Sequence, residues 1–191
     1  TYGPHYAVLY GKQNHLLSLP GFNHYFITGA EIPYKFQPGN VNYELSYGIL
    51  GLCDYLDDLA SVHYGDAVAT TPRSRLEQAF ELISAYEDLI GDRLLRYLNQ
   101  KPNVRILGVP HADPQQRVPT ISFVIEGVDS ASIPSQIDPH RIGIRYGDFY
   151  AKRLIQDLGL VAQNGVIRVS MVHYNTLEEI DRLISCFDRL F

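Results

Sequence analysis

Two arginines lie inside short apolar segments that read as β-strands. Arg145 lies in the segment 142–146 (IGIRY), and Arg168 lies in the segment 166–171 (VIRVSM). A guanidinium is rarely placed on a core strand without a carboxylate or phosphate partner, because burying an unpaired charge is costly. Either arginine could therefore bind a substrate carboxylate with its planar, two-pronged set of donors. The residues alone also allow an internal ion pair or an exposed edge strand.

A second candidate binding element is the turn at Gly39 and Asn40, which comes just before an expected long helix. Backbone N–H groups in such a turn can hold a phosphate, helped by the dipole of the helix. The alternative is a plain turn in which Asn40 caps the helix.

Other common kinds of site find no support. The seven histidines form no H-x-x-x-H pair and no Cys/His cluster with metal-ligand spacing, so no metal site is expected. The sequence contains neither G-x-S-x-G nor a Walker loop, so a triad hydrolase or a P-loop NTPase is not indicated.

The composition indicates a globular protein of one domain, or of one small domain and a piece of another. The chain has 191 residues, of which 46% are hydrophobic and 19% charged. A formal net charge of −5 gives no electrostatic reason to expect nucleic acid or an anionic membrane as partner. No apolar run approaches the about 18 residues of a membrane span. The two cysteines, Cys53 and Cys186, are expected to be buried free thiols, and we expect a cytoplasmic protein.

The first half of the chain is expected to be mainly helical. Residues 7–10 read as a buried strand and residues 25–28 as a short strand, inside a long irregular stretch. Residues 41–63 are expected to form a helix, because apolar residues recur at three- and four-residue spacing. A second helix is expected from Pro72 to about residue 99, with Thr71 as its N-cap.

The second half alternates strands with helices. The expected strands cover residues 104–107, 118–125, 142–146 and 166–171, and the expected helices cover residues 130–137, 148–158 and 176–190. Thr176 and Glu179 have the spacing of a capping box at the start of the last helix. The pattern predicts an α/β or α+β arrangement in which helices cover a small sheet.

Four segments resemble, in order, the pyridoxal-phosphate enzymes of the class V aminotransferase group. They are TYGPHYAVLYG (1–11), KFQPGNVNYEL (35–45), RYGDFYA (145–151) and IRVSMVHYNTLEEIDRLI (167–184). The most similar branch is that of the cysteine desulfurase-like proteins, sometimes labelled isopenicillin-N-epimerase-like. The resemblance spans nearly the whole chain and implies the C-terminal portion of a pyridoxal-phosphate-dependent transferase fold (fold type I).

The resemblance also implies a division into domains. Residues 1–40 would end the large cofactor-binding domain, residues 41–65 would form a connecting helix, and residues 66–191 would form the small C-terminal α/β domain. The lysine that forms the Schiff base with the cofactor would immediately precede Thr1, so no catalytic lysine is expected within the chain itself.

The same resemblance assigns substrate-binding residues. Arg168 matches the arginine that binds the substrate α-carboxylate, and Arg145 matches a second active-site arginine. Five positions after Arg145, desulfurases place the cysteine that attacks the substrate sulfur, whereas this chain has Tyr150. That departure argues against sulfur transfer through a protein persulfide.

Cofactor contacts are implied for three residues near the start of the chain. Gly39 and Asn40 match a phosphate-binding segment shared between subunits, although the family has a threonine where this chain has Asn40, and a homodimer is therefore implied. His5 would approach the cofactor. The expected function is aminotransferase, lyase or epimerase chemistry on an amino acid. The alternatives are a non-catalytic binding or scaffold domain and a true cysteine desulfurase.

Overall fold

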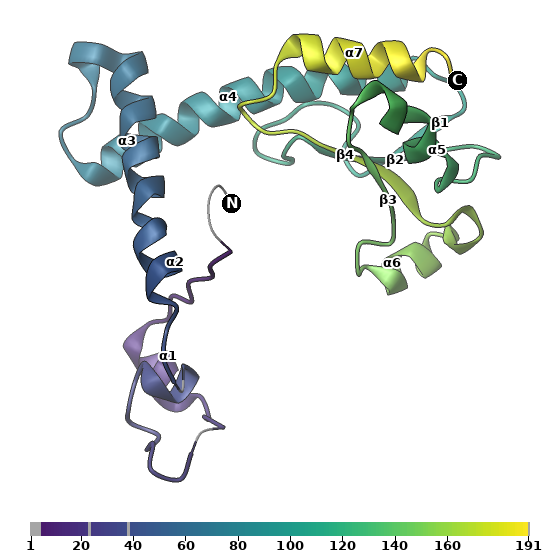
Figure 1. Ribbon diagram of the computed structural model, residues 1–191. Coiled ribbons are helices and arrows are strands. Elements are labelled where there is room, and N and C mark those ends of the chain that lie inside the picture. Colours follow the sequence, from purple (N-terminus) through teal and green to yellow (C-terminus); the bar gives the residue numbers. More distant parts are fainter. Residues whose placement is uncertain (1–4, 23, 38, 191) are drawn as a thin grey trace. The chain divides into compact units, whose positions relative to one another are not determined.

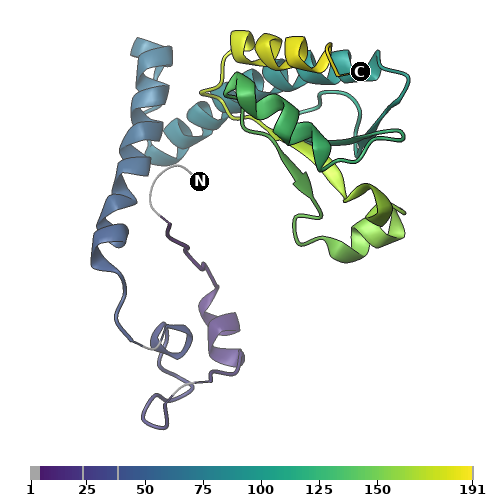
Figure 2. The same cartoon turned by 45° about the vertical axis from the view of Figure 1, so that its right-hand side comes forward.

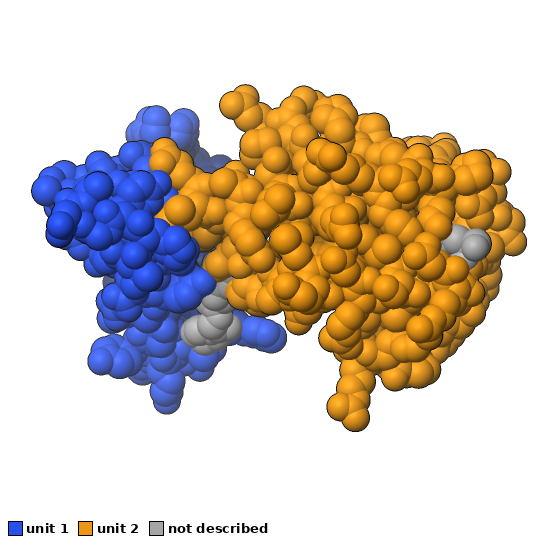
Figure 3. Space-filling model, turned by 90° about the horizontal axis from the view of Figure 1, so that it is seen from above, with its two compact units in different colours: residues 1–79 blue, residues 80–191 orange. Residues whose placement is uncertain are grey.

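The computed structural model describes residues 5–22, 24–37 and 39–190. The chain divides into two compact units, unit 1 (Thr1–Ala79) and unit 2 (Phe80–Phe191), which Figure 3 draws in different colours. In the described ranges, no helix combines the length and the apolar character needed to cross a membrane.

Unit 2 contains a four-stranded antiparallel sheet with the order β1-β2-β4-β3. Its strands are β1 (Val104–Leu107), β2 (Thr120–Ile125), β3 (Arg145–Gly147) and β4 (Val166–Ser170). Three of them lie within the segments predicted from the sequence, and β3 overlaps the predicted segment 142–146 but ends one residue beyond it, at Gly147. The inner strands β2 and β4 are longer than β3, which forms an edge.

In unit 2, helices and strands occur along the chain in the predicted order. The helices are α4 (Pro72–Asn99), whose residues from 80 onward belong to unit 2, α5 (Ser132–Ile137), α6 (Lys152–Asp157) and α7 (Leu177–Phe187), with short 3-10 turns at Asp138–His140 and Val161–Gln163. The Thr176 capping box is confirmed, since Thr176 and Glu179 each bond the other's backbone N–H. Figures 1 and 2 both show α4 and α7 side by side along one face of the sheet, with α6 on the other side.

The two faces of the sheet are built from alternate residues of the same strands. The helix-covered face packs with side chains of α4, α5 and α7 in the main core, and its strand residues are Ile121, Phe123, Ile125, Ile167 and Val169. The opposite face, here the arginine face, carries Ser122, Val124, Val166, Arg168 and Ser170, with Arg145 on the neighbouring strand. A smaller cluster covers one end of it, where Val124 and Val166 pack with Ile155, Leu160 and the partly buried Phe149.

Unit 1 is helical where it is regular. Its helices are α1 (Gln13–Ser18), α2 (Tyr43–Gly48) and α3 (Leu50–Tyr64), with 3-10 turns at Tyr34–Phe36 and Gly65–Ala67. The helix expected over residues 41–63 is therefore present as two pieces that meet at Ile49. The strands predicted at residues 7–10 and 25–28 are wrong, because a strand needs a neighbour and the described part of unit 1 offers none.

The two cysteines differ from each other. Cys186 is a buried free thiol as predicted, but Cys53 is exposed, so its predicted burial is wrong. Within α3 only Leu56 and Ala60 are buried. The apolar pattern of this helix therefore exceeds the surface that unit 1 covers, and Cys53 lies on the uncovered part.

Candidate functional site

Arg145 and Arg168 lie directly opposite each other on the neighbouring strands β3 and β4. On the other side of β4, Arg168 is in register with Ser122 of β2. Residues paired in this way point to the same face, so the two guanidinium groups share the arginine face. Like charges placed directly across a sheet repel each other, which makes this pairing unfavourable unless an anion offsets it.

Neither arginine has an acidic partner among the described residues, because no ion pair in that part of the chain includes them. The Nε atom of Arg168 is buried and no described group accepts a hydrogen bond from it. β4 is an inner strand, so Arg168 does not lie on an exposed edge. Since the described residues also give it no ion pair, neither of the two alternatives to a binding role accounts for Arg168. Arg145 is different, because it is exposed on the edge strand β3.

The Arg168 guanidinium lies over the ring of Phe149, with its central carbon 3.7 Å from the ring centroid. At this distance the positive charge interacts with the negative face of the ring. Phe149 is half-buried and packs against the small cluster of the arginine face. The stack therefore connects the arginine to the packed end of that face.

A strained turn brings Phe149 to this position. Phe149 and Tyr150 have φ values of 51° and 64°, a left-handed conformation that is uncommon outside glycine. The carboxylate and carbonyl of Asp148 accept hydrogen bonds from Tyr150 N (3.0 Å) and Ala151 N (2.8 Å). Left-handed residues outside glycine persist only where their surroundings hold them, and they often mark functional sites.

This turn also explains a shorter helix than the sequence predicted. A helix was expected over residues 148–158, but α6 begins only at Lys152. Two consecutive left-handed residues cannot continue a right-handed helix. Sequence reasoning missed Phe149 because a single aromatic residue in a turn has no periodicity. Its one signal is its place in RYGDFYA, between Asp148 and Tyr150.

The side chain of Tyr150 is fully exposed, so the structure places it in solvent beside this turn. Its expected contact with substrate stays a prediction.

The expected cofactor-binding residues all belong to unit 1. His5 and Asn40 are exposed, and Gly39 has a φ of 114°, which favours glycine. The residue that caps α2 is Asn42, whose Oδ1 accepts a hydrogen bond from Leu45 N at 2.8 Å. The alternative in which Asn40 caps the helix is therefore wrong. Pro38 and the segment 1–4 lie outside the described residues.

Lys35 is buried in unit 1 and is held by backbone oxygens alone among its described hydrogen bonds. Its Nζ donates to the carbonyls of Leu17 (3.1 Å), Leu19 (2.8 Å) and Gly29 (2.8 Å). Through these three hydrogen bonds, one side chain joins irregular segments that lie apart in the sequence.

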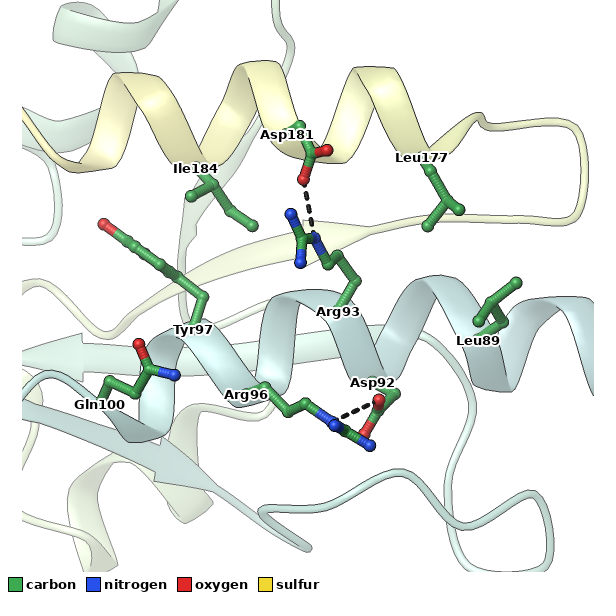
Figure 4. A pocket seen from close by; sticks show the side chains of 9 residues that line it. All are labelled: Leu89, Asp92, Arg93, Arg96, Tyr97, Gln100, Leu177, Asp181 and Ile184. Carbon is green, nitrogen blue, oxygen red and sulfur yellow. Dashed lines mark hydrogen bonds and ion pairs between the residues drawn. The ribbon is translucent and has the colours of Figure 1, made fainter.

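A groove of about 430 Å³ lies between α4 and α7, as Figure 4 shows. Its charges are satisfied within the groove. Arg93 Nε binds Asp181 Oδ1 at 2.8 Å and Arg96 Nε binds Asp92 Oδ2 at 2.6 Å. The arginines of this groove are therefore neutralised by neighbouring acids, whereas Arg145 and Arg168 have no acidic partner in the part of the chain that the structure describes.

A model of the family described as aminotransferase class-V matches residues 74–183. The chain is 33% identical to aminotransferase-like protein FGM3 of Gibberella zeae, covering 96% of this chain and 42% of that protein. It is 28% identical to cysteine desulfurase-like protein ustD of Aspergillus flavus, covering 99% and 40%. A probable cysteine desulfurase of Pseudomonas putida is 31% identical, with 98% and 43% covered. The chain thus spans about two fifths of the length of these curated relatives.

Among solved structures, the chain is similar to an apo cysteine desulfurase from Thermococcus onnurineus NA1. The TM-score is 0.53 at 24% sequence identity, and the match covers 62% of this chain and 28% of that chain. This likeness concerns the fold, and it confirms the expected fold class, a portion of an α/β fold of type I.

Proposed function

Because the chain belongs to the class V aminotransferase family, we propose that the intact protein is a pyridoxal-phosphate-dependent enzyme that acts on an amino acid. The family depends on this cofactor. When bound, pyridoxal phosphate supplies an electron sink for bond breaking at the substrate α-carbon. The observation that carries the proposal is Arg168, a cation on an inner strand whose buried Nε has no acceptor among the described residues. A substrate carboxylate fits this site because it supplies both the acceptor and the charge.

Arg168 binds the α-carboxylate of the amino acid in this proposal, with Arg145 as a second cation on the same face. A bidentate contact fixes the carboxylate in the plane of the guanidinium and so orients the α-carbon. Tyr150 completes the substrate side from the turn that follows β3. These roles are supported by the lack of an acidic partner for either arginine among the described residues.

The cofactor side is assigned to unit 1. Gly39 and Asn40 would hold the phosphate through backbone N–H groups and the Asn40 amide, and His5 would approach the ring. The exposure of Asn40, and its freedom from helix capping, support this assignment. The phosphate site would be shared in a homodimer, and the lysine that holds the cofactor would directly precede Thr1. A cytoplasmic location remains part of the proposal.

Aminotransferase, lyase or epimerase chemistry is the reaction class that we favour. Cysteine desulfuration is the second candidate, since relatives of this chain are named for it. In the expected nucleophile position this chain has Tyr150, whose phenol cannot carry a persulfide. Incubation of the intact protein with L-cysteine and a thiol reductant separates the two, because desulfuration converts cysteine to alanine and the reductant releases the transferred sulfur as sulfide.

The cofactor is tested first. The intact protein, purified with pyridoxal phosphate, is expected to show the visible absorbance of the lysine-bound cofactor, and borohydride reduction followed by mass spectrometry should place it on the residue before Thr1. An intact protein that never binds the cofactor, or that has a residue other than lysine directly before Thr1, would favour the non-catalytic scaffold. Light scattering tests the homodimer.

Arg168→Ala tests the substrate site. We expect unchanged cofactor absorbance and amino-acid binding weakened by about 1.5–3 kcal/mol, as for a lost hydrogen bond to a charged group. Titration of the bound cofactor's spectrum with L-alanine measures this. Arg105→Ala is the matched control, because Arg105 is exposed on β1 and paired with Val124 of the arginine face. Equal affinities in the two variants would remove Arg168 from the site.

A further inference from the structure

We propose that Phe149 is a positioning residue, whose ring holds the Arg168 guanidinium in the orientation that meets the substrate carboxylate. The proposal rests on the proposed function, because it concerns the same arginine. It adds a residue that has no polar group and that the resemblance does not assign.

The stacking geometry is the first support. The central carbon of the Arg168 guanidinium lies 3.7 Å from the centroid of the Phe149 ring. A ring that lies flat against the guanidinium at this distance would cover one of its faces and leave the N–H donors, which lie in its plane, available to a ligand. A carboxylate binds those in-plane donors, so the ring and the substrate do not compete.

Charge is the second support. Arg145 lies directly opposite Arg168, and in the described part of the chain neither has an acidic partner. The positive charge of Arg168 interacts with the electron-rich face of the Phe149 ring. An acid in the same place would hold the arginine equally well but would compete with the substrate carboxylate. An aromatic ring fixes the cation without neutralising it.

The third support is that Phe149 is itself fixed. It packs against the cluster of Val124, Ile155, Leu160 and Val166. Its left-handed backbone is held by the turn at Asp148, whose carboxylate accepts a hydrogen bond from Tyr150 N at 3.0 Å. A strained residue that is packed from behind is suited to hold a partner side chain in one orientation.

The test compares Phe149→Leu with Phe149→Tyr in the intact protein with its cofactor. Leucine keeps the apolar packing and removes the π face, whereas tyrosine keeps the ring. We expect Phe149→Leu to raise the Kd for L-alanine about five- to thirtyfold, the span from an exposed to a desolvated cation–π contact. The Kd for L-alaninamide, which lacks the carboxylate, should stay unchanged. Phe149→Tyr, which keeps the ring, should bind L-alanine as the wild type does.

A second measurement does not depend on the cofactor. Phenylglyoxal adds to guanidinium groups, and mass spectrometry gives the rate of modification at each arginine. In Phe149→Leu, Arg168 should react several times faster than in the wild type, while the exposed Arg105 reacts at the same rate in both. Protein that fails to bind pyridoxal phosphate would overturn the proposed function, yet this rate would still test the role of the ring.

Two outcomes would overturn the role of Phe149. One is an unchanged reaction rate at Arg168 in Phe149→Leu. The other is an equal loss of affinity for L-alanine and L-alaninamide, which would show that the ring contributes packing alone.

Discussion

The two faces of the sheet in unit 2 use the same strands for different purposes. On the helix-covered face, Ile121, Phe123 and Ile167 are fully or almost fully buried against the main core. On the arginine face, Ser122 and Arg168 alternate with them in the same two strands. Because successive residues of a strand point to opposite faces, core positions alternate along each strand with the positions that we propose for binding.

The difference shows how the proposed site can hold two arginines that have no acidic partner among the described residues without loss of the fold. The repulsion between Arg145 and Arg168 acts on a face that contributes little apolar burial at these positions. The helix-covered face, which holds most of the core, is untouched by it. We therefore expect substitutions on one face to change stability and those on the other to change binding.

The largest expected effect is on the helix-covered face. Phe123 is completely buried and meets Phe187 of α7 edge to face, with ring centroids 5.7 Å apart. Phe123→Ala should lower the free energy of unfolding by about 3–5 kcal/mol, because it leaves a cavity in the core. Ser122→Ala, one residue away on the arginine face, should change it by less than about 0.5 kcal/mol. Urea denaturation of both variants measures the difference. Similar losses of stability would mean that the two faces contribute equally to the free energy of unfolding.

A smaller effect is expected at the close contact between Gly165 and the end of β3. Gly165 has a φ of 81°, and a side chain there would collide with the carbonyl of Gly147, at the end of β3. Gly159 has a similar φ of 71° but no atom in the way. Both alanine substitutions should be strained by about 1 kcal/mol or more, and Gly165→Ala should cost more because β3 must also move. Thermal unfolding and L-alanine affinity test this. A larger loss in Gly159→Ala would contradict the collision.

The sequence predicted unit 2 well because its elements have local signals. The period of the apolar residues located the four strands, and the Thr176 capping box located α7. The same period placed Arg168 on a face with Val166 and Ser170. What it could not supply was the pairing of strands distant in the sequence, and so the opposition of Arg145 and Arg168.

The failures of prediction have physical causes as well. Residues 7–10 are apolar enough for a strand, but a strand depends on a neighbour that the local pattern cannot reveal. Phe149 depends on two left-handed residues, a conformation that no ordinary side chain signals in advance. The contacts of Lys35 have little local signal, because two of its three carbonyl partners lie 18 and 16 residues away.

The smallest expected effect concerns the attachment of α7 to α4 on the helix-covered face. Lys101 Nζ donates to Asp188 Oδ1 at 2.8 Å, and Tyr97 Oη donates to the same oxygen at 2.9 Å. The hydrogen bond from Lys101, followed by that from Tyr97, lowers the pKa of Asp188 below its usual 3.8. Burial, followed by the hydrogen bond to Asp188, raises the pKa of Tyr97 to about 12.

The sign of the resulting pH dependence follows from the lowered pKa of Asp188. A carboxyl group that binds its proton less tightly in the folded state contributes stability above its unfolded pKa, about 3.9, and loses it as the pH falls through the folded value. Asp188→Asn should therefore flatten part of the fall in stability below about pH 4. Asp157→Asn is the control, because Asp157 is exposed on α6 and has no ion pair among the described residues. Urea denaturation midpoints between about pH 3 and 6 measure the effect. If wild type and Asp188→Asn lose stability equally as the pH falls, the contact at Asp188 does not contribute to the stability of the folded protein.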